Sequence, residues 1–425
     1  MLKSPVTSKH VEDGASSRSP WPAFGVASMQ GWRLRMEDAH LAVPDFDVDR
    51  QNGLFGVFDG HGGAAVAQVV SERLPAILLA NPKYKAGQYS DALSEAFFEM
   101  DRVLDTAVVR KDIVNRAAKY PASEEEEDSD DEMFAFGEEG GESDPEGFVF
   151  DEEEEEDNDE DPEEEFDGAV DALDAGVLES NNLWISGEGP DCMGTTAVVA
   201  LVCMKTQEVF VANAGDSRCI LLSGSRGADL SRDHKPILKS ERLRIKKAGG
   251  FVLNPEDGGR VDGNLSLSRA LGDFAYKRNK KLKPSEQKIS CEPEVRRHTL
   301  APSDKFLVLG CDGIWEKAST QDVAKFLRSR VYQTGELRRK LSSACAEFLD
   351  TNLAKNPMAD GGLGCDNMTL MAVDLRGRTE SANLSASLAQ TRKSRSKRGQ
   401  VVRRLPRAMR RRVVLRWNVV IKSMK

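Results

Sequence analysis

The sequence contains few of the residue patterns that mark disulfide-bonded and membrane proteins. It has seven cysteines in 425 residues, and no two of them are spaced as C-x-x-C. Cys203 and others lie in apolar runs such as AVVALVCM, where cysteine behaves as a small buried hydrophobic residue. No apolar run approaches 18 residues, so no transmembrane helix is predicted. These absences favour a reduced, intracellular protein over a disulfide-bonded scaffold.

Charge of one sign is missing from two long segments. Residues 124–167 contain 27 Asp and Glu residues and no Lys or Arg, whereas residues 392–425 contain 14 Lys and Arg residues and no Asp or Glu. The first segment carries −27 and the second +14, so the chain outside both segments, at +2, is nearly neutral, and the acidic balance of −11 comes from the first segment. Such composition cannot repay the entropy of ordering. We expect a disordered acidic insertion at 121–182, a basic C-terminal tail at 377–425 and a disordered N-terminus at 1–20.

Apolar patterns in the remaining residues predict strands and helices in blocks. LFGVFD (54–59), GTTAVVALVCM (194–204), EVFVANAGDS (208–217), FLVLGCDG (306–313) and MTLMAVDL (368–375) are typical of buried strands. Helical spacing follows GHGG and recurs in KSERLRIKKAGG, which ends in a glycine pair. Blocks of strands and helices, without strict alternation, favour packed antiparallel sheets with helices outside over a doubly wound parallel fold.

Four short segments place carboxylates at or beside strand ends. They are MEDAH (36–40), VFDGHGG (57–63), GCDGIWE (310–316) and CDNMT (365–369). Carboxylates gathered at one end of a sheet repel each other unless a cation neutralises them. Oxygen ligands select hard divalent ions such as Mg²⁺ or Mn²⁺, and a pair of these ions can activate water against a phosphoryl group. The segments therefore predict a site for hard divalent cations, which would suit phosphoryl transfer to water.

Several motifs in order resemble a known family. QGWRLRMEDAH, FDGHGG, GTTAV, VANAGDSR, DHKP, GRVDGNLSLSRALGDFAYK, CDGIW and CDNMT are similar to those of the magnesium- or manganese-dependent protein phosphatases of the protein phosphatase 2C class. The acidic interruption and GDFAYKRNKKLKPSEQ most resemble the gamma isoform of that family. The resemblance implies an α+β fold, with a central β-sandwich of two mainly antiparallel sheets flanked by helices (α-β-β-α) and a flap subdomain. The catalytic domain would span 21–120 and 183–376, with the flap within 225–287.

The resemblance also implies roles for individual residues at a site with two Mg²⁺ or Mn²⁺ ions and a third, weaker one. Asp59 would bridge the two ions, and His61 would protonate the leaving Ser or Thr oxygen. Arg33 would clamp the phosphate, and Arg260 of the flap is a further candidate for substrate binding. The other metal ligands would be Glu37, the Gly60 carbonyl, Asp312 and Asp366, with Asp38 holding a water ligand, Asp216 at the third position and Glu316 there in place of the family's usual Asp.

These features predict a monomeric protein-serine/threonine phosphatase that acts on phosphorylated proteins. The acidic insertion could dock basic nuclear proteins, act as a spacer or fold back on the tail. The basic tail is typical of nuclear-import or nucleic-acid-binding segments, so we expect a nuclear or cytoplasmic location. Two alternatives stay open: a catalytically silent phosphatase-fold scaffold, and an acidic chaperone for basic nuclear proteins. Catalysis by a cysteine nucleophile is not expected.

Overall fold

The computed structural model describes residues 1–17, 22–119, 189–254, 258–331 and 340–376. All of them belong to one of the two units into which the chain divides, Met1–Lys119 with Glu188–Lys425. The second unit, Tyr120–Gly187, lies outside the described residues. The expected acidic insertion and basic tail therefore fall outside the description of the structure as well.

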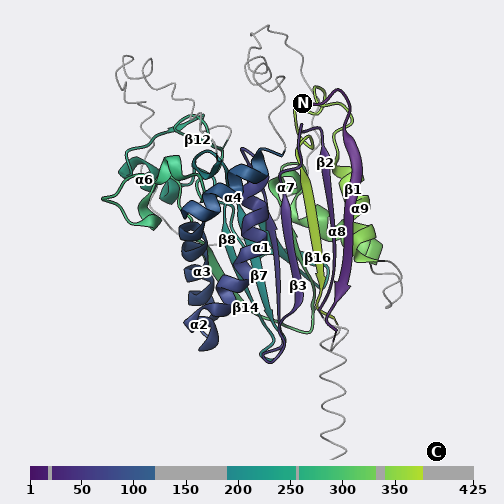
Figure 1. The fold of residues 1–425 in the computed structure, drawn as a ribbon. Coiled ribbons are helices and arrows are strands. Elements are labelled where there is room, and N and C mark those ends of the chain that lie inside the picture. Colours follow the sequence, from purple (N-terminus) through teal and green to yellow (C-terminus); the bar gives the residue numbers. More distant parts are fainter. Residues whose placement is uncertain (18–21, 120–188, 255–257, 332–339, 377–425) are drawn as a thin grey trace, which may run out of the picture. The chain divides into compact units, whose positions relative to one another are not determined.

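Two antiparallel sheets form the centre of the first unit (Figure 1). The larger has the strand order β1-β2-β16-β15-β9-β10, and the smaller has the order β14-β8-β7-β4-β3. The larger sheet consists of β1 (Val6–Ala15), β2 (Ala23–Gly31), β16 (Met368–Asp374), β15 (Asp304–Gly310), β9 (Arg218–Ser223) and β10 (Arg226–Asp229). The smaller consists of β14 (Glu294–Thr299), β8 (Glu208–Ala214), β7 (Ala197–Cys203), β4 (Asn52–Phe58) and β3 (Ala39–Asp47).

The central strands read as continuous apolar runs because both of their faces are buried. In β7, Val198, Ala200 and Val202 belong to the hydrophobic cluster that includes the facing sheet. The alternate residues of the strand, such as Val199 and Leu201, belong to a second cluster with the helices on the other face. Period-2 geometry thus divides one apolar run between two cores.

Helices cover the outer face of each sheet. Against the smaller sheet lie α1 (Ala65–Ala80), α2 (Pro82–Lys85), α3 (Tyr89–Leu104) and α4 (Ala107–Ala117). Against the larger sheet lie α8 (Thr320–Val331) and α9 (Leu341–Asn352), and the short α7 (Asp312–Trp315) follows β15. The layers are α-β-β-α, which confirms the predicted fold class.

The prediction of a disordered N-terminus at residues 1–20 is wrong for most of that range. Val6–Ala15 form β1, which pairs with β2 along its length at the edge of the larger sheet. Side chains tie the strand to α9, through Lys9 Nζ and Asp350 Oδ1 at 2.5 Å and through Ser342 Oγ and Asp13 Oδ2 at 2.6 Å. The strand contains few apolar residues because it is exposed, so hydrophobic periodicity could not reveal it.

The chain between β10 and β14 forms small elements outside the two large sheets. They are α6 (Lys239–Lys247), β11 (Val252–Leu253), β12 (Arg260–Val261), β13 (Leu271–Gly272) and the 3₁₀ turns η4 (Phe274–Lys277) and η5 (Pro284–Glu286). β13 joins a small sheet with β6 (Gly194–Thr195) and β5 (Gly60–His61), and the turn η2 (Gly189–Asp191) precedes β6. We call the part from α6 through Ser290 the flap; in Figure 1, α6 and β12 lie together to one side of the sheets. Among the described residues, no helix is both long and apolar enough to span a membrane.

Candidate active site

The loops at one end of the two sheets bring the predicted carboxylates together. Asp59 follows β4, Asp216 follows β8 and Asp312 follows β15. Asp366 precedes β16, and Glu37 lies between β2 and β3. Antiparallel pairing brings the ends of β4 and β8 together in one sheet and puts the end of β15 beside the start of β16 in the other. The ligand atoms of Asp59 and Cys311 lie within 4.8 Å of each other, so these strand ends meet at the same end of the sandwich. Residues from distant parts of the sequence thus share one site.

The carboxylates form two adjoining groups of donor atoms. One ligand atom each from Asp312, Glu316 and Asp366 lies within 4.8 Å of the others, and the same holds for Asp38, Asp59 and Cys311. Oxygen atoms dominate this donor set, which suits hard divalent cations.

Burial and mutual repulsion disfavour the charged forms of these groups. Burial raises the pKa of Asp38 to about 7, and the charge of Asp366 adds to the shift. Burial, followed by the charge of Asp312, raises the pKa of Asp59 well above its usual value. Oδ1 of Asp38 and Oδ1 of Asp216 are buried without a hydrogen-bond partner among the described residues. Buried carboxylate oxygens that accept no hydrogen bond fit a site that holds cations.

Threonine hydroxyls and a backbone amide fix the positions of Asp59 and Asp38. Thr195 Oγ1 donates to the carbonyl of Asp59 at 2.9 Å, and the Thr196 amide donates to the same carbonyl at 2.9 Å. On the other side of the site, Thr369 Oγ1 donates to Asp38 Oδ2 at 2.7 Å. The sequence motif GTTAV contains the first two residues, but their bracing role was not predicted.

Asn367 organises the loop that carries Arg33 and Glu37. Its Nδ2 donates to the carbonyls of Gln30 and Arg35, both at 2.8 Å, and its Oδ1 accepts from the amide of Glu37 at 2.8 Å. Gly60 also approaches this loop closely, since a Cβ at that position would lie 2.5 Å from the Glu37 carbonyl oxygen. The glycine in DGHGG is therefore required for the close approach of two segments of the site.

Arg33, the residue predicted to bind the phosphate, pairs with one of the carboxylates. Its Nη2 donates to Asp366 Oδ2 at 2.7 Å, while 56 % of its side chain remains exposed. A guanidinium has five N–H donors in a fixed fork, so one ion pair leaves donors for an incoming phosphate.

His61 lies beside an aspartate that the sequence analysis did not assign to the site. Its Nε2 lies 2.8 Å from Asp273 Oδ2 and 2.9 Å from Asp273 Oδ1. Burial lowers the pKa of His61, but the charge and hydrogen bond of Asp273 more than offset it, and the pKa is raised. A Cβ at Gly194 would lie 2.1 Å from Asp273 Oδ2 and 2.5 Å from His61 Nε2, so the GTTAV glycine makes room for this pair.

Lys235 pairs with Asp216, the residue predicted to bind a third metal ion. Lys235 Nζ donates to Asp216 Oδ2 at 2.6 Å. Burial lowers the pKa of Lys235, but the Asp216 and Asp312 carboxylates outweigh that effect and raise it. Glu316, the other residue expected there, is grouped with Asp312 and Asp366. The ammonium group therefore already compensates part of the charge at Asp216.

Arg260 is not joined to the carboxylates by the contacts of the described residues. It lies in β12, and its Nη1 donates to the carbonyl of Asn264 at 2.7 Å within the flap. Its role in substrate binding remains a prediction.

The cysteines do not form a nucleophilic site. Cys291 and Arg297 have the C-x₅-R spacing used by cysteine-dependent phosphatases, but burial raises the pKa of Cys291 well above its usual value. The Nε of Arg297 donates to Glu208 Oε1 at 2.8 Å instead of forming a phosphate loop. Burial and then the charges of Asp38 and Asp59 likewise keep the Cys311 thiol protonated by raising its pKa. All seven cysteines are free thiols.

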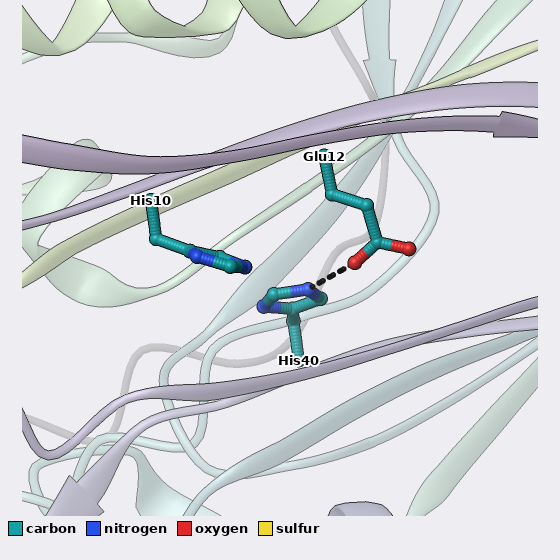
Figure 2. Close-up of side chains that lie close together, drawn as sticks. All are labelled: His10, Glu12 and His40. Carbon is teal, nitrogen blue, oxygen red and sulfur yellow. Dashed lines mark hydrogen bonds and ion pairs between the residues drawn. The ribbon is translucent and has the colours of Figure 1, made fainter.

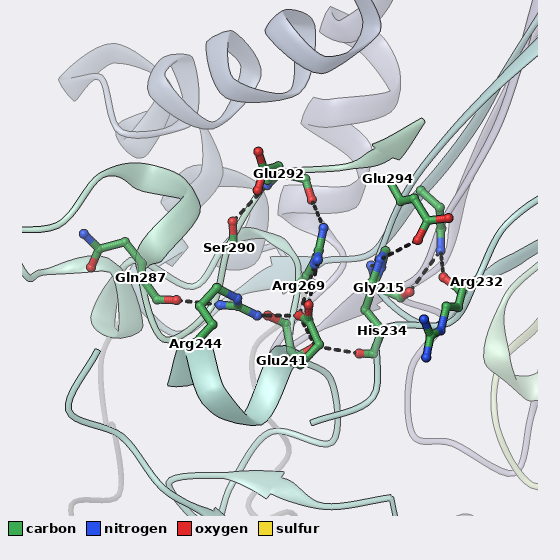
Figure 3. A network of polar contacts seen from close by, with 12 residues as sticks. Gly215, Arg232, His234, Glu241, Arg244, Arg269, Gln287, Ser290, Glu292 and Glu294 are labelled. Carbon is green, nitrogen blue, oxygen red and sulfur yellow. Dashed lines mark hydrogen bonds and ion pairs between the residues drawn. The ribbon is translucent and has the colours of Figure 1, made fainter. Parts of the chain in front are cut away.

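A buried ion-pair network joins the flap to the site (Figure 3). Glu241 of α6, 2 % exposed, accepts hydrogen bonds from Arg269 Nη2 at 2.6 Å, Arg244 Nη2 at 2.5 Å and Ser268 Oγ at 2.7 Å. Ser268 Oγ also lies 2.9 Å from the carbonyl of His234, the residue before Lys235. The network therefore anchors the segment that carries Lys235.

Comparison with known proteins identifies the class to which this fold and site belong. A family model described as "Protein phosphatase 2C" matches residues 23–129 and 141–359. "Probable protein phosphatase 2C 58" of Oryza sativa is 36 % identical over 375 residues, which cover 88 % of this chain and 89 % of that protein. "Protein phosphatase 2C homolog 2" of Schizosaccharomyces pombe is 34 % identical over 376 residues, covering 88 % of this chain and 77 % of that protein.

A solved structure has the same fold. A "serine-threonine phosphatase 2C from Toxoplasma gondii" superposes with a TM-score of 0.55 at 17 % identity, covering 86 % of this chain and 99 % of that one. The chain is a metal-dependent protein-serine/threonine phosphatase, a phosphoric monoester hydrolase. It belongs to the protein phosphatase 2C family.

Proposed function

We propose that this enzyme hydrolyses phosphoserine and phosphothreonine in proteins at a binuclear Mg²⁺ or Mn²⁺ site. Its ligands would be Glu37, Asp59, the Gly60 carbonyl, Asp312 and Asp366, with Asp38 positioning water. The single observation that supports the proposal is the convergence of these half-buried carboxylates, beside which Asp38 Oδ1 and Asp216 Oδ1 have no hydrogen-bond partner among the described residues. When bound, the cations supply Lewis acidity to the phosphoryl group and lower the pKa of the attacking water.

The chain's own residues bind the substrate and supply a proton. Arg33 binds the phosphate with the guanidinium donors that Asp366 leaves accessible. Asp273 holds His61 by Nε2, so Nδ1 is the nitrogen that donates a proton to the leaving serine or threonine oxygen. Water attacks phosphorus in line as the P–O bond to the alcohol breaks.

Turnover of a phosphothreonine peptide is expected to require added divalent metal. Protein freed of metal by chelation should be inactive, and Mn²⁺ or Mg²⁺ should restore activity, because the clustered carboxylates need compensating charge before a phosphate dianion can enter. Phosphate release is measured with and without metal. Metal-independent turnover would contradict the proposed site, and absent turnover under all conditions would favour the silent-scaffold alternative.

We also propose a third, weaker cation position at Asp216 and Glu316, for which Lys235 competes. Replacing Lys235 with alanine is expected to tighten cation binding there by about 10-fold, because Asp216 loses its 2.6 Å ion-pair partner. Calorimetric titration with Mn²⁺ measures the change, and Lys288→Ala, which removes a similar ion pair with Asp262 in the flap, is the matched control. Unchanged Mn²⁺ binding in Lys235→Ala would contradict the competition.

The family resemblance further supports assigning the chain to the gamma type with an acidic insertion. The 27 acidic residues at 124–167 would dock basic nuclear proteins, and the basic tail would direct a monomeric enzyme to the nucleus, with or without direct nucleic-acid binding, or leave part of it in the cytoplasm.

Deleting residues 123–167 is expected to spare hydrolysis of a small aryl phosphate but to weaken activity on a basic phosphoprotein. The reason is that the docking charge lies outside the catalytic carboxylates. Steady-state rates on the two substrates make the comparison. An equal loss on both would remove the docking role.

A further inference from the structure

A second group of metal-binding side chains lies where the edges of the two sheets face each other. His10 and Glu12 belong to β1, which ends the larger sheet, and His40 belongs to β3, which ends the smaller one. Residues i and i+2 of a strand point to the same side. Figure 2 shows the two β1 side chains directed at the ring of His40. The group therefore spans the open edge of the sandwich.

The alternation of β1 explains why these residues are directed away from the helices. Lys9 and Asp13 bond to residues of α9 on one side of the strand. His10 and Glu12, at the intervening positions, face the other sheet. β1 thus uses one face to bind α9 and leaves the other, polar face directed at β3.

The donor atoms are spaced for a transition-metal ion. One ligand atom from each of His10, Glu12 and His40 lies within 4.8 Å of the others. His40 Nε2 and Glu12 Oε2 are 3.2 Å apart, and the rings of His10 and His40 have centroids 5.7 Å apart. In a tetrahedral Zn²⁺ site with bonds of about 2.0–2.1 Å, donors are separated by roughly 3.3 Å. The His40–Glu12 pair already has this spacing, and His10 is exposed and can adjust.

We propose that His10, Glu12 and His40 bind one Zn²⁺ ion that links the edge strands of the two sheets. Two imidazoles and one carboxylate favour Zn²⁺ over the Mg²⁺ or Mn²⁺ that all-oxygen sites select. Glu12 is 48 % exposed, so water has access to the fourth coordination position. The site shares no residue with the catalytic carboxylates and differs from them in its donor types, although His40 lies two positions after Asp38.

The ion would hold the N-terminal strand against the loop of the catalytic site. β1 is followed along the sheet by β2, and the amide of Leu2 donates to the carbonyl of Trp32, at the start of the loop that carries Arg33 and Glu37. The loop lies between β2 and β3, so a link from β1 to β3 would restrain β3 directly and β2 through its pairing with β1. Such a restraint adds to the backbone pairing of an otherwise exposed edge strand.

The test uses the full-length chain without a histidine tag. The protein is first freed of metal by chelation and then placed in saturating Mg²⁺, which occupies the site formed by the catalytic carboxylates. Co²⁺ is added as a coloured substitute for Zn²⁺. We expect one equivalent of Co²⁺ to produce visible absorption bands of low-coordinate geometry, and one equivalent of Zn²⁺ to abolish them. His10→Ala and His40→Ala should each weaken Co²⁺ binding at least about 10-fold. Zn²⁺ should raise Tm by about 2 °C or more in the wild type and not in these variants.

Two control variants distinguish Co²⁺ bound at this site from Co²⁺ bound by other side chains. His298→Ala removes a histidine that pairs with one carboxylate, Asp304, at 3.0 Å, and should leave Co²⁺ binding unchanged. In an Asp312→Asn background the Co²⁺ bands should persist, because the catalytic site is not their source. The proposal is overturned if the wild type gives no bands, if both His10→Ala and His40→Ala keep them, if Asp312→Asn removes them, or if a near-ultraviolet thiolate band shows ligation by cysteine. None of these outcomes depends on phosphatase activity.

Discussion

Replacing Asp312 with asparagine is expected to lower kcat/KM on a phosphothreonine peptide by at least about 10³-fold, or ~4 kcal/mol of transition-state stabilisation. Asp312 lies at the first position of α7, with its carboxylate in the same donor group as those of Glu316 and Asp366. An amide of nearly the same shape keeps the packing but removes the charge that a divalent cation requires. The loss should therefore appear in metal binding and turnover together.

The same substitution should stabilise the metal-free protein. Burial, and then the charges of Asp216 and Asp366, raise the pKa of Asp312 well above its usual value. A carboxyl group with a raised folded-state pKa contributes stability below its unfolded pKa of 3.8, and this contribution is lost as pH rises through the folded pKa. Asparagine does not titrate, so the gain in Tm of the chelated variant over the chelated wild type should be larger at pH 8 than at pH 4.

Thermal unfolding with and without Mn²⁺, beside steady-state kinetics, distinguishes this result from simple misfolding. The variant should have a higher Tm without metal, a smaller rise on adding Mn²⁺ and little activity. Asp91→Asn is the matched control, since Asp91 of α3 is exposed and pairs only weakly with Lys83 at 3.4 Å. Activity within a few-fold of the wild type, or a lower Tm for chelated Asp312→Asn, would contradict the assignment.

The carboxylates of the site could be predicted from the sequence because each follows a local signal. An apolar strand that stops at Asp59 or Asp312 beside glycine is visible in a short window, and several such windows in one chain point to a shared site. Packed sheets with helices outside were predictable for the same reason, since strands such as β7 are apolar throughout, and the family resemblance implied the α-β-β-α layers. The structure adds that these windows meet at one end of the sandwich.

The residues that support the site had no comparable signal. Asp273 is 212 positions from His61 in the chain, and Lys235 is 19 positions from Asp216. Both lie in segments that carry the family resemblance, DHKP and GRVDGNLSLSRALGDFAYK, but only the folded chain makes each a partner of a catalytic or metal-binding group. β1 was missed for the opposite reason, because an edge strand held by backbone hydrogen bonds needs no apolar periodicity.

The buried carboxylate of Glu241 is the partner whose loss should cost the most stability. Glu241→Gln is expected to lower the free energy of unfolding by about 3–5 kcal/mol at pH 7. The substitution removes the negative charge between the guanidinium groups of Arg244 and Arg269, which are 2.5 Å and 2.6 Å from its oxygens. It also places an amide N–H₂ group where donors already converge, so at least one buried donor loses its acceptor.

The pH dependence of the free energy of unfolding tests independently whether the charge of Glu241 stabilises the fold. Burial alone would raise the pKa of Glu241, but the hydrogen bond from Arg269 and the charge of Arg244 lower it from 4.5 to about 2. A depressed folded-state pKa means that the stabilisation is present above pH 4.5 and is lost as pH falls through about 2, which corresponds to about 3 kcal/mol. The free energies of unfolding of wild type and variant, measured in urea, should therefore differ most at pH 7 and converge toward pH 2.

The control is Glu286→Gln. Glu286 is an exposed carboxylate in the flap that accepts a hydrogen bond from the amide of Lys283, so this variant should behave like the wild type at both pH values. If the difference in free energy of unfolding between Glu241→Gln and the wild type did not depend on pH, packing and not charge would hold α6 in place. The contacts from Glu241 through Ser268 to His234 would then contribute no electrostatic stabilisation to the segment that carries Lys235.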